Sequence, residues 1–197
     1  EMASRLSYFL WDSMPDATLF GAAAKGRLRT AEQIQAQARR MLENPKARNA
    51  VTHFHNQWLG TTDIHTISPA RRAYGPAHYG LSPDPLLDTS DDFTWPTLLI
   101  NVRRSMAMET DLFVERTLFD GAGTFEALLS DNHGYMSRHT LPLYGEEAVY
   151  LDGPAVRWTG NDSSAAYGQS FSIDLFPAEF PANQRAGVLT LPSLLAL

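Results

Sequence analysis

Residues 30–45 read TAEQIQAQARRMLENP, the stretch of the chain with the clearest helix signals. Thr30 and Gln33 have the spacing of a capping box, in which each side chain accepts a hydrogen bond from the backbone N–H of the other residue. Pro45 cannot continue a helix but suits the start of one, because a first-turn residue needs no N–H partner. Between these signals the apolar residues recur at helical spacing, at Ile34, Ala38, Met41 and Leu42. The stretch therefore predicts one amphipathic helix and the start of another.

Further helices are predicted on both sides of this stretch. The pattern from Met2 to Trp11 is helical, Pro15 ends it, and Asp16 is placed to cap the next helix. The helix that starts at Pro45 ends at Gly60. We expect its buried stripe to contain Val51, Phe54, Trp58 and Leu59.

The longest helix is predicted from about Trp95 to Phe119, and Thr124 caps a short helix after it. The stripe of the longest helix contains Leu98, Val102, Met106, Glu109 and Phe113. Residues 61–92 have no regular pattern, and Gly and Pro divide the chain beyond Asp131 into short pieces. One short strand is indicated there by the alternation of Phe171, Ile173 and Leu175.

The fold class that we expect is mainly α. It is an antiparallel helical bundle-like domain with a long irregular connection and a loop-rich C-terminal third with little β. We expect residues 1–145 to form the helical domain. Residues 146–197 would be a loop-rich extension and the start of a following domain.

The composition excludes several kinds of site. The chain has no cysteine, which removes disulfides, thiolate metal sites and covalent c-type haem within this chain. The net charge of −6 disfavours nucleic acid, because binding phosphates needs a concentrated cationic surface. Basic pairs such as Arg39-Arg40, Arg71-Arg72 and Arg103-Arg104 are typical of solvated helix faces. No apolar run reaches the length of about 18 residues that a membrane span needs.

Several short motifs are distinctive, and they read ASRLSYFLW at 3–11, SMPD at 13–16, RRML at 39–42, QWLG at 57–60 and ETDLF at 109–113. With these motifs the chain resembles a helical domain of unknown function from planctomycete and myxobacterial multidomain proteins. The resemblance covers residues 1–145. It extends to the join near 185–197, where RAGVLT at 185–190 is similar to the opening of the domain that usually follows.

The resemblance implies a setting and no particular reaction. In that family the domain usually lies downstream of a cytochrome-c-like module, in bacterial proteins that look exported. It therefore implies a periplasmic or extracellular location, with neighbouring domains of the same parent protein as partners. A redox role would belong to that parent, because the haem module lies outside this chain. The start at Glu1 and the apolar run from Val188 to Leu197 likewise lead us to expect a piece of a longer protein.

Glu109 is the candidate catalytic residue. It falls within the apolar stripe of the longest helix, where an unpaired carboxylate is costly. One interpretation is a structural ion pair with Arg5, Arg103 or Arg104. The other is a general acid or base, as carboxylates provide in glycoside hydrolysis.

His65 and His78 are the candidate metal ligands, because neutral imidazoles bind zinc. The alternative is two unrelated loop histidines. His53 and His55 are two residues apart on a helix and point in different directions, so we expect a core role for His55 and solvent exposure for His53. Asp131 and Asn132 offer oxygens either to calcium or to an Asx turn.

The function that we expect is a structural or interaction module of a larger exported bacterial protein that is associated with c-type cytochrome modules. The alternative is a hydrolase, directed at polysaccharide, that uses Glu109 or the histidine pair. A weaker hypothesis is an accessory of electron transfer that packs against the haem module. The sequence identifies no small-molecule or glycan ligand.

Overall fold

The computed structural model describes residues 1–66, 95–144, 149–161, 170–181 and 186–196. The chain divides into two compact units, Glu1–Trp58 and Leu59–Leu197. Most of the irregular connection predicted over 61–92 lies outside the described residues, but its first part forms the 3₁₀ helix η1, Thr61–Thr66. The predicted domain boundary near 145 stays a prediction.

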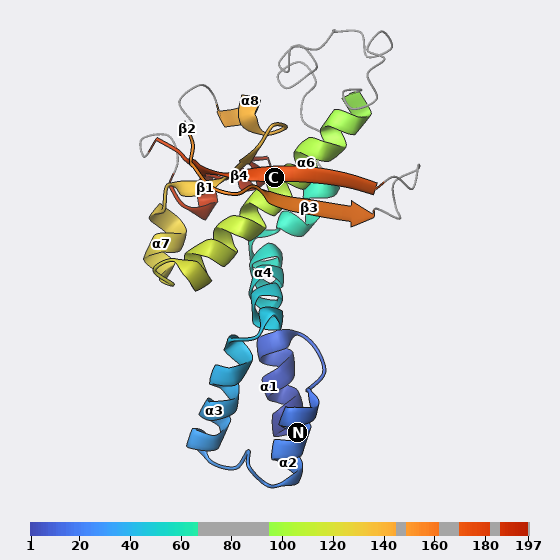
Figure 1. Ribbon diagram of the computed structural model, residues 1–197, viewed down its shortest axis with the longest axis vertical. Coiled ribbons are helices and arrows are strands. Elements are labelled where there is room, and N and C mark those ends of the chain that lie inside the picture. Colours follow the sequence, from blue (N-terminus) through green and yellow to red (C-terminus); the bar gives the residue numbers. More distant parts are fainter. Residues whose placement is uncertain (67–94, 145–148, 162–169, 182–185, 197) are drawn as a thin grey trace. The chain divides into compact units, whose positions relative to one another are not determined.

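The first unit contains α1 (Met2–Trp11), α2 (Ala17–Ala24), α3 (Ala31–Leu42) and nearly all of α4 (Pro45–Leu59), shown in Figure 1. The predicted caps are confirmed. Asp16 accepts a hydrogen bond from Leu19 N–H at 2.8 Å, and both hydrogen bonds of the capping box between Thr30 and Gln33 are present. Local sequence therefore determines where these helices begin.

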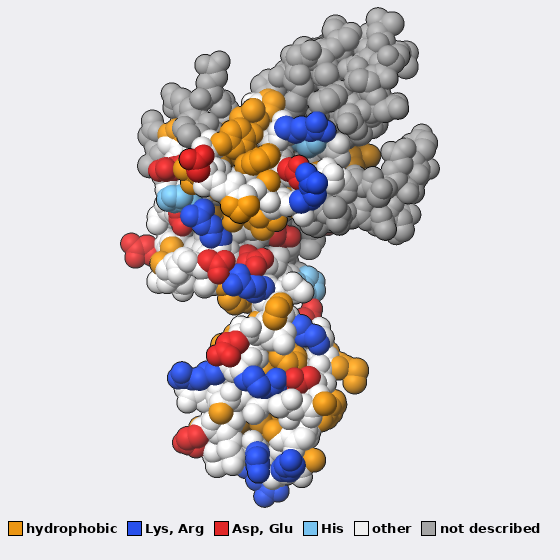
Figure 2. Space-filling view, viewed as in Figure 1, with side chains coloured by type: hydrophobic (Ala, Val, Ile, Leu, Met, Phe, Trp, Pro, Cys, Tyr) orange, Lys and Arg blue, Asp and Glu red, His pale blue; other side chains and the backbone are white. Residues whose placement is uncertain are grey.

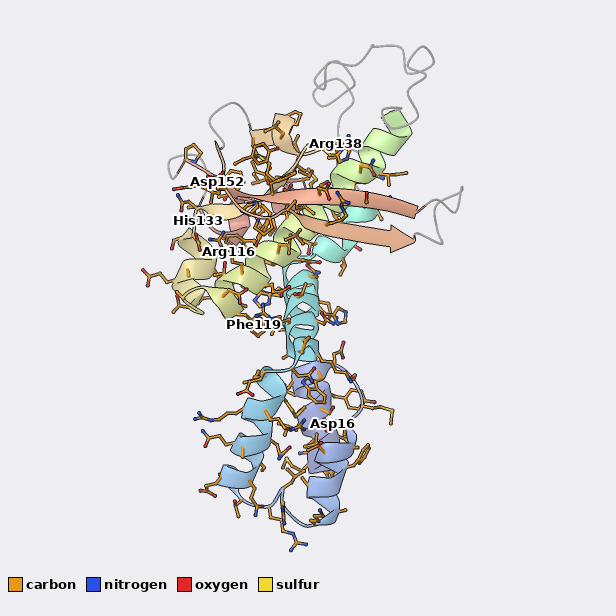
Figure 3. The ribbon with its side chains drawn as sticks, viewed as in Figure 1. Asp16, Arg116, Phe119, His133, Arg138 and Asp152 are labelled. Atoms are coloured by element: carbon orange, nitrogen blue, oxygen red, sulfur yellow. The ribbon has the colours of Figure 1, made fainter. Side chains whose placement is uncertain are left out.

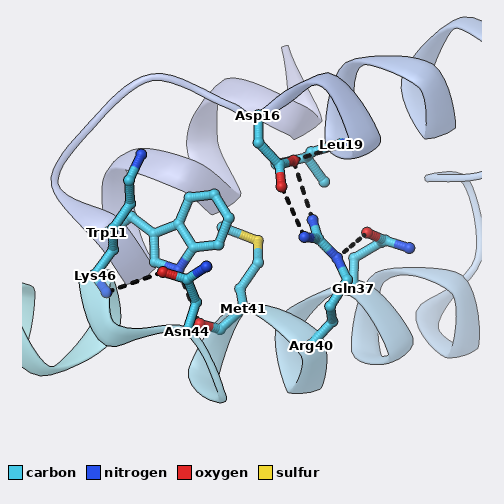
Figure 4. Close-up of polar contacts among 8 residues, drawn as sticks. All are labelled: Trp11, Asp16, Leu19, Gln37, Arg40, Met41, Asn44 and Lys46. Carbon is cyan, nitrogen blue, oxygen red and sulfur yellow. Dashed lines mark hydrogen bonds and ion pairs between the residues drawn. The ribbon is translucent and has the colours of Figure 1, made fainter.

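Trp11 lies at the centre of the core of the first unit and is only 4% exposed. Its indole N–H donates to the backbone oxygen of Met41 at 2.8 Å, so the buried ring leaves no polar atom unsatisfied. Arg40 and Lys46 lie over the ring, and Arg40 also forms a bidentate ion pair with Asp16 at 2.7 and 3.1 Å (Figure 4). One tryptophan thus connects α1 to α3 and to the start of α4.

The buried stripe that we predicted for α4 is wrong in part. Phe54 and Trp58 are 62% and 51% exposed, whereas Ala47 and His55 are buried. The inner face therefore follows the i, i+4, i+8 row that starts at Ala47, one position away from the aromatic residues. His55 can be buried because its Nδ1 lies 2.8 Å from the backbone oxygen of Val51.

The second unit is built around α6 (Trp95–Glu115), which continues as the π-helical turn η3 (Arg116–Asp120). Its other described elements are α7 (Phe125–Ser130), β1 (His133–Ser137), α8 (Leu141–Tyr144), β2 (Val149–Tyr150), β3 (Val156–Asn161), β4 (Ser170–Glu179), η4 (Val188–Thr190) and α9 (Pro192–Leu195). The predicted mainly α fold class is confirmed. The sequence indicated one of the strands, since β4 contains the alternating residues 171–175.

In the described part of the chain, β1, β2 and β3 each pair antiparallel with β4. β1 pairs from His133 opposite Glu179 to Ser137 opposite Leu175, and β3 pairs from Val156 opposite Leu175. Apolar residues of α6 pack against two different neighbours. Met108 contacts the β4 residues Ile173 and Leu175, whereas Val102 and Met106 pack with Ile64 of η1.

Gly187 fixes the last described segment against α7. Its φ of +71° lies in the left-handed region, and its N–H donates to the backbone oxygen of Asp131 at 2.8 Å. A Cβ at this position would lie 2.1 Å from the backbone carbonyl of Leu129. Glycine is therefore required in the motif at 185–190 for two independent reasons.

We expect Gly187→Ala to lower the free energy of unfolding by about 3 kcal/mol or more, because the added methyl overlaps backbone that cannot move away. Leu189→Ala is the control, since Leu189 is 55% exposed and should cost less than about 1 kcal/mol. Urea denaturation measures both variants. Equal stability of the two variants would contradict the close backbone approach.

The Asp16–Arg40 ion pair should give stability that depends on pH. The hydrogen bonds from Arg40 hold the pKa of Asp16 below its ordinary value of 3.8. Because the folded-state pKa is depressed, the stabilisation is present above the unfolded-state pKa and is lost as pH falls through the folded-state value. Asp16→Asn, which keeps a capping oxygen, should cost up to about 1 kcal/mol at pH 7, and the difference should vanish in acid.

Denaturation followed by tryptophan fluorescence at pH 7 and at lower pH measures this difference. A gap between the wild-type protein and Asp16→Asn that persisted in acid would show that lost charge is not its cause. Asp16→Ala removes the cap as well and should cost about 1 kcal/mol more at every pH.

Candidate functional site

Glu109 is almost completely buried, with 1% of its side chain exposed. It lies on α6 among the apolar residues that form the core of the second unit, as the stripe of this helix predicts. Ser105 lies one turn earlier on the same face and is fully buried. A carboxylate in this position needs hydrogen-bond donors, because burying an unsatisfied charge costs several kcal/mol.

Three donors from the segment after α7 reach both oxygens of Glu109. The backbone N–H of Ser137 donates to Oε1 at 3.3 Å, and the hydroxyl of Thr140 donates to the same atom. The hydroxyl of Tyr144 donates to Oε2. This arrangement suits the ionised carboxylate, which can only accept hydrogen bonds.

The donors are themselves held by a buried set of hydroxyls. Ser137 Oγ donates to Ser105 Oγ at 2.8 Å and lies 3.1 Å from Thr140 Oγ1. The same Ser137 Oγ accepts from the backbone N–H groups of His139 and Thr140 at 3.1 and 3.3 Å. We call Ser105, Glu109, Ser137, Thr140 and Tyr144 the Glu109 network. It joins α6 to the end of β1 and to α8.

The charge of Glu109 also acts on Tyr150, in β2. Burial is the main cause that raises the pKa of Tyr150 above 10.0, and the negative charge of Glu109 adds to it. Both effects disfavour the phenolate. The Tyr150 ring lies edge-on to Phe176 of β4, with the ring centroids 5.6 Å apart.

Two of the three arginines expected to neutralise Glu109 have other surroundings. Arg5 forms an exposed ion pair with Glu1 at 2.7 Å. Arg103 lies on α6, its Nε is buried without a hydrogen-bond partner among the described residues, and burial lowers its pKa. The donors shown for Glu109 are hydroxyl and amide groups. A role for Glu109 as a general acid or base stays a prediction.

The candidate metal ligands are not brought together by the described part of the protein. His78 lies outside the described residues, and so does the side chain of His65, whose backbone is in η1. Within residues 1–66, 95–144, 149–161, 170–181 and 186–196, no group of three or more His, Asp and Glu side chains could hold a metal ion. The pair His65 and His78 stays a prediction.

His53, His55 and His133 each lie within hydrogen-bond distance of another residue. His55 is buried, as predicted, and His53 is exposed with its Nδ1 2.8 Å from Asp12 Oδ2. Asp131 accepts from the backbone N–H of His133 at 2.9 Å, which is the predicted Asx turn. His133 opens β1 and Arg138 follows its last residue, so the polar segment of the sequence is largely a strand (Figure 3).

Sequence reasoning found Glu109 and missed the residues that surround it. Ser105 carried a usable signal, because it lies four residues before Glu109 on a predicted helix. Ser137, Thr140 and Tyr144 carried none, since they are 28, 31 and 35 residues from Glu109 in the sequence and contact it only in the folded chain. The chemistry that this arrangement supports is the satisfaction of a buried charge. For a hydrolytic role, the Glu109 carboxylate would have to contact a substrate, but its side chain is only 1% exposed.

We expect Glu109→Gln to lower the free energy of unfolding by about 2 kcal/mol, since hydrogen bonds to a charged group are worth about 1.5–3 kcal/mol each. It should also lower the pKa of Tyr150 toward 10.0, because the negative charge is gone. Urea denaturation and spectroscopic tyrosine titration, with Tyr150→Phe as the reference, measure the two effects.

Glu126→Gln is the control, because Glu126 is exposed in the first turn of α7 and should cost less than about 1 kcal/mol. If Glu109→Gln were as stable as the wild-type protein, the carboxylate would not be the anchor of this network.

Comparison with known proteins gives one family match, which covers the first 145 residues. The family model described as a protein of unknown function (DUF1592), also named PSD4, matches residues 1–145. No curated protein and no solved structure matches the chain. In the described part of the protein, no helix is both long and apolar enough to cross a membrane. The chain belongs to the DUF1592 (PSD4) family of proteins of unknown function.

Proposed function

We propose that the chain is a structural and interaction module of a larger exported bacterial protein, in which it contacts neighbouring domains that include cytochrome-c-like modules. The observation that carries this proposal is the outer face of α1, on which three large hydrophobic side chains are exposed: Met2, Tyr8 and Phe9. Their exposed fractions are 40%, 56% and 82%. Tyr and Phe are enriched at protein interfaces, whereas a soluble surface rarely gathers large apolar side chains.

The opposite side of α1 explains why this face is available for binding. Ala3, Ser7 and Trp11 are buried, and Ser7 Oγ donates to the backbone oxygen of Ser13 at 2.7 Å. The core contacts and this hydrogen bond fix the rotation of the helix about its axis. Phe9 is therefore held outward on a rigid support, which lowers the entropy lost when a partner binds.

The enclosed position of Glu109 also favours an interaction module over the hydrolase alternative. Its carboxylate oxygens are occupied by donors that belong to the fold, and its side chain is 1% exposed. A general acid must lie within hydrogen-bond reach of a substrate atom. Glu109 would have to become exposed to meet a substrate, whereas the outer face of α1 is already exposed to a partner.

The test uses the chain and the rest of the parent polypeptide as two separate proteins. We expect Tyr8→Ser with Phe9→Ser to weaken their binding about tenfold or more, because exposed aromatic anchors carry much of the energy of an interface. Isothermal titration calorimetry measures the affinity, and circular dichroism checks the fold.

The matched control is Phe125→Ser, which removes a phenylalanine that is 63% exposed on α7. It should leave the affinity unchanged. Absence of binding by the wild-type chain, or equal losses in both variants, would overturn the proposal.

A further inference from the structure

The two units differ sharply in charge. Residues 1–58 contain eight Lys and Arg against five Asp and Glu, whereas residues 59–197 contain eight against seventeen. The formal charges are therefore +3 and −9, which together give the −6 of the whole chain. The negative charge of the protein is therefore not spread evenly over the chain: the first unit is positive and the second is negative.

Three of the eight cations of the first unit lie in the short connection between α2 and α3. Lys25, Arg27 and Arg29 are all exposed there, and we call these three residues the cationic tip. No acidic residue occurs between Asp16 and Glu32. Figure 2 shows Lys and Arg side chains gathered at the end of the unit where Figure 1 places this connection.

The backbone of the cationic tip is fixed at both ends. The N–H groups of Gly26 and Arg27 donate to the oxygens of Ala23 and Ala22 at 3.0 and 2.8 Å, with Gly26 at a φ of +67°. On the other side Arg29 N–H donates to Gln33 Oε1 at 3.0 Å. Leu28 is buried in the core at 7% exposure, so its two neighbouring arginines remain on the surface.

The three cations lie within residues 25–29 and have no ion-pair partner among the described residues. The guanidinium of Arg29 lies over Gly26, because a Cβ there would be 3.4 Å from Arg29 Nε. Asp16, the acid before the cationic tip, is already bound by Arg40. Glu32, the acid after it, is exposed in the first turn of α3.

Helix stability accounts for Lys25 but not for Arg29. Lys25 follows the last turn of α2, where a cation interacts favourably with the helix dipole. Arg29 directly precedes the N-cap of α3, where a positive charge is unfavourable. The charge of Arg29 is therefore not explained by the helix that it precedes.

We infer that the cationic tip is a docking surface for an acidic protein segment, whose clustered Asp and Glu side chains pair with Arg27 and Arg29. The guanidinium group binds carboxylates through two parallel hydrogen bonds, and complementary charge also speeds the encounter. This inference rests on the proposed interaction function and adds the chemistry of the partner.

The other polyanions fit less well. Nucleic acid affinity rises with the number of phosphates contacted, and three cations on a chain of net charge −6 offer few contacts. An anionic membrane contributes about 1 kcal/mol per cation, and firm attachment needs an apolar anchor as well. Leu28, the apolar residue of the cationic tip region, is buried in the core.

The test measures binding of the whole chain to labelled poly-L-glutamate by fluorescence anisotropy at low and physiological salt. We expect salt-sensitive binding that Arg27→Gln with Arg29→Gln weakens about tenfold. Arg5→Gln with Arg39→Gln is the matched control, because it removes two exposed charges from the same unit and should change the affinity less than about twofold. Single-stranded DNA and phosphatidylserine vesicles are the comparison ligands.

Three outcomes would overturn the inference: no binding of poly-L-glutamate, equal losses in the two double variants, or tighter binding of DNA or vesicles through the same arginines. The result is independent of the test on α1, because the probe contains no part of the parent protein. Loss of poly-L-glutamate binding alone would remove the acidic partner and leave the interaction module intact.

Discussion

The second unit depends on one constraint, the burial of the Glu109 carboxylate within the apolar stripe of α6. A charge in that position destabilises the fold unless both oxygens receive hydrogen bonds. The donors come from Ser137, Thr140 and Tyr144, so the end of β1 and the last residue of α8 must lie against α6. β1 also pairs with β4, which connects the network to the sheet.

In the first unit the buried polar group that needs a hydrogen-bond partner belongs to an aromatic residue. Trp11 brings a large apolar surface into a small helical core, and its indole N–H is satisfied by Met41 O. Arg40 covers the ring and reaches Asp16, so the N-terminal cap of α2 and the C-terminal half of α3 share one ion pair. The core faces of the helices are thus engaged inside the unit, which leaves aromatic and cationic residues on the outside.

The buried residues stabilise the first unit and its exposed residues remain available for contacts, which supports a binding role. The outer face of α1 offers apolar contact, and the cationic tip offers charge, on a unit whose net charge is opposite in sign to that of the remaining chain. In protein interfaces, apolar anchors supply most of the affinity, whereas charges set the partner and the rate of encounter. The Glu109 network, by contrast, contributes rigidity to the second unit.

The sequence by itself determined the helices and their limits, because Asp16, Thr30, Pro45 and Thr124 act through neighbouring backbone groups. It also indicated that Glu109 would be buried and that His55 would lie in the core. Only the tertiary structure decided which side of α4 faces inward, which strands join β4, and which hydroxyls surround Glu109. These features depend on contacts between residues that are distant in the chain. Helical periodicity and turn residues reflect local structure and do not predict such contacts.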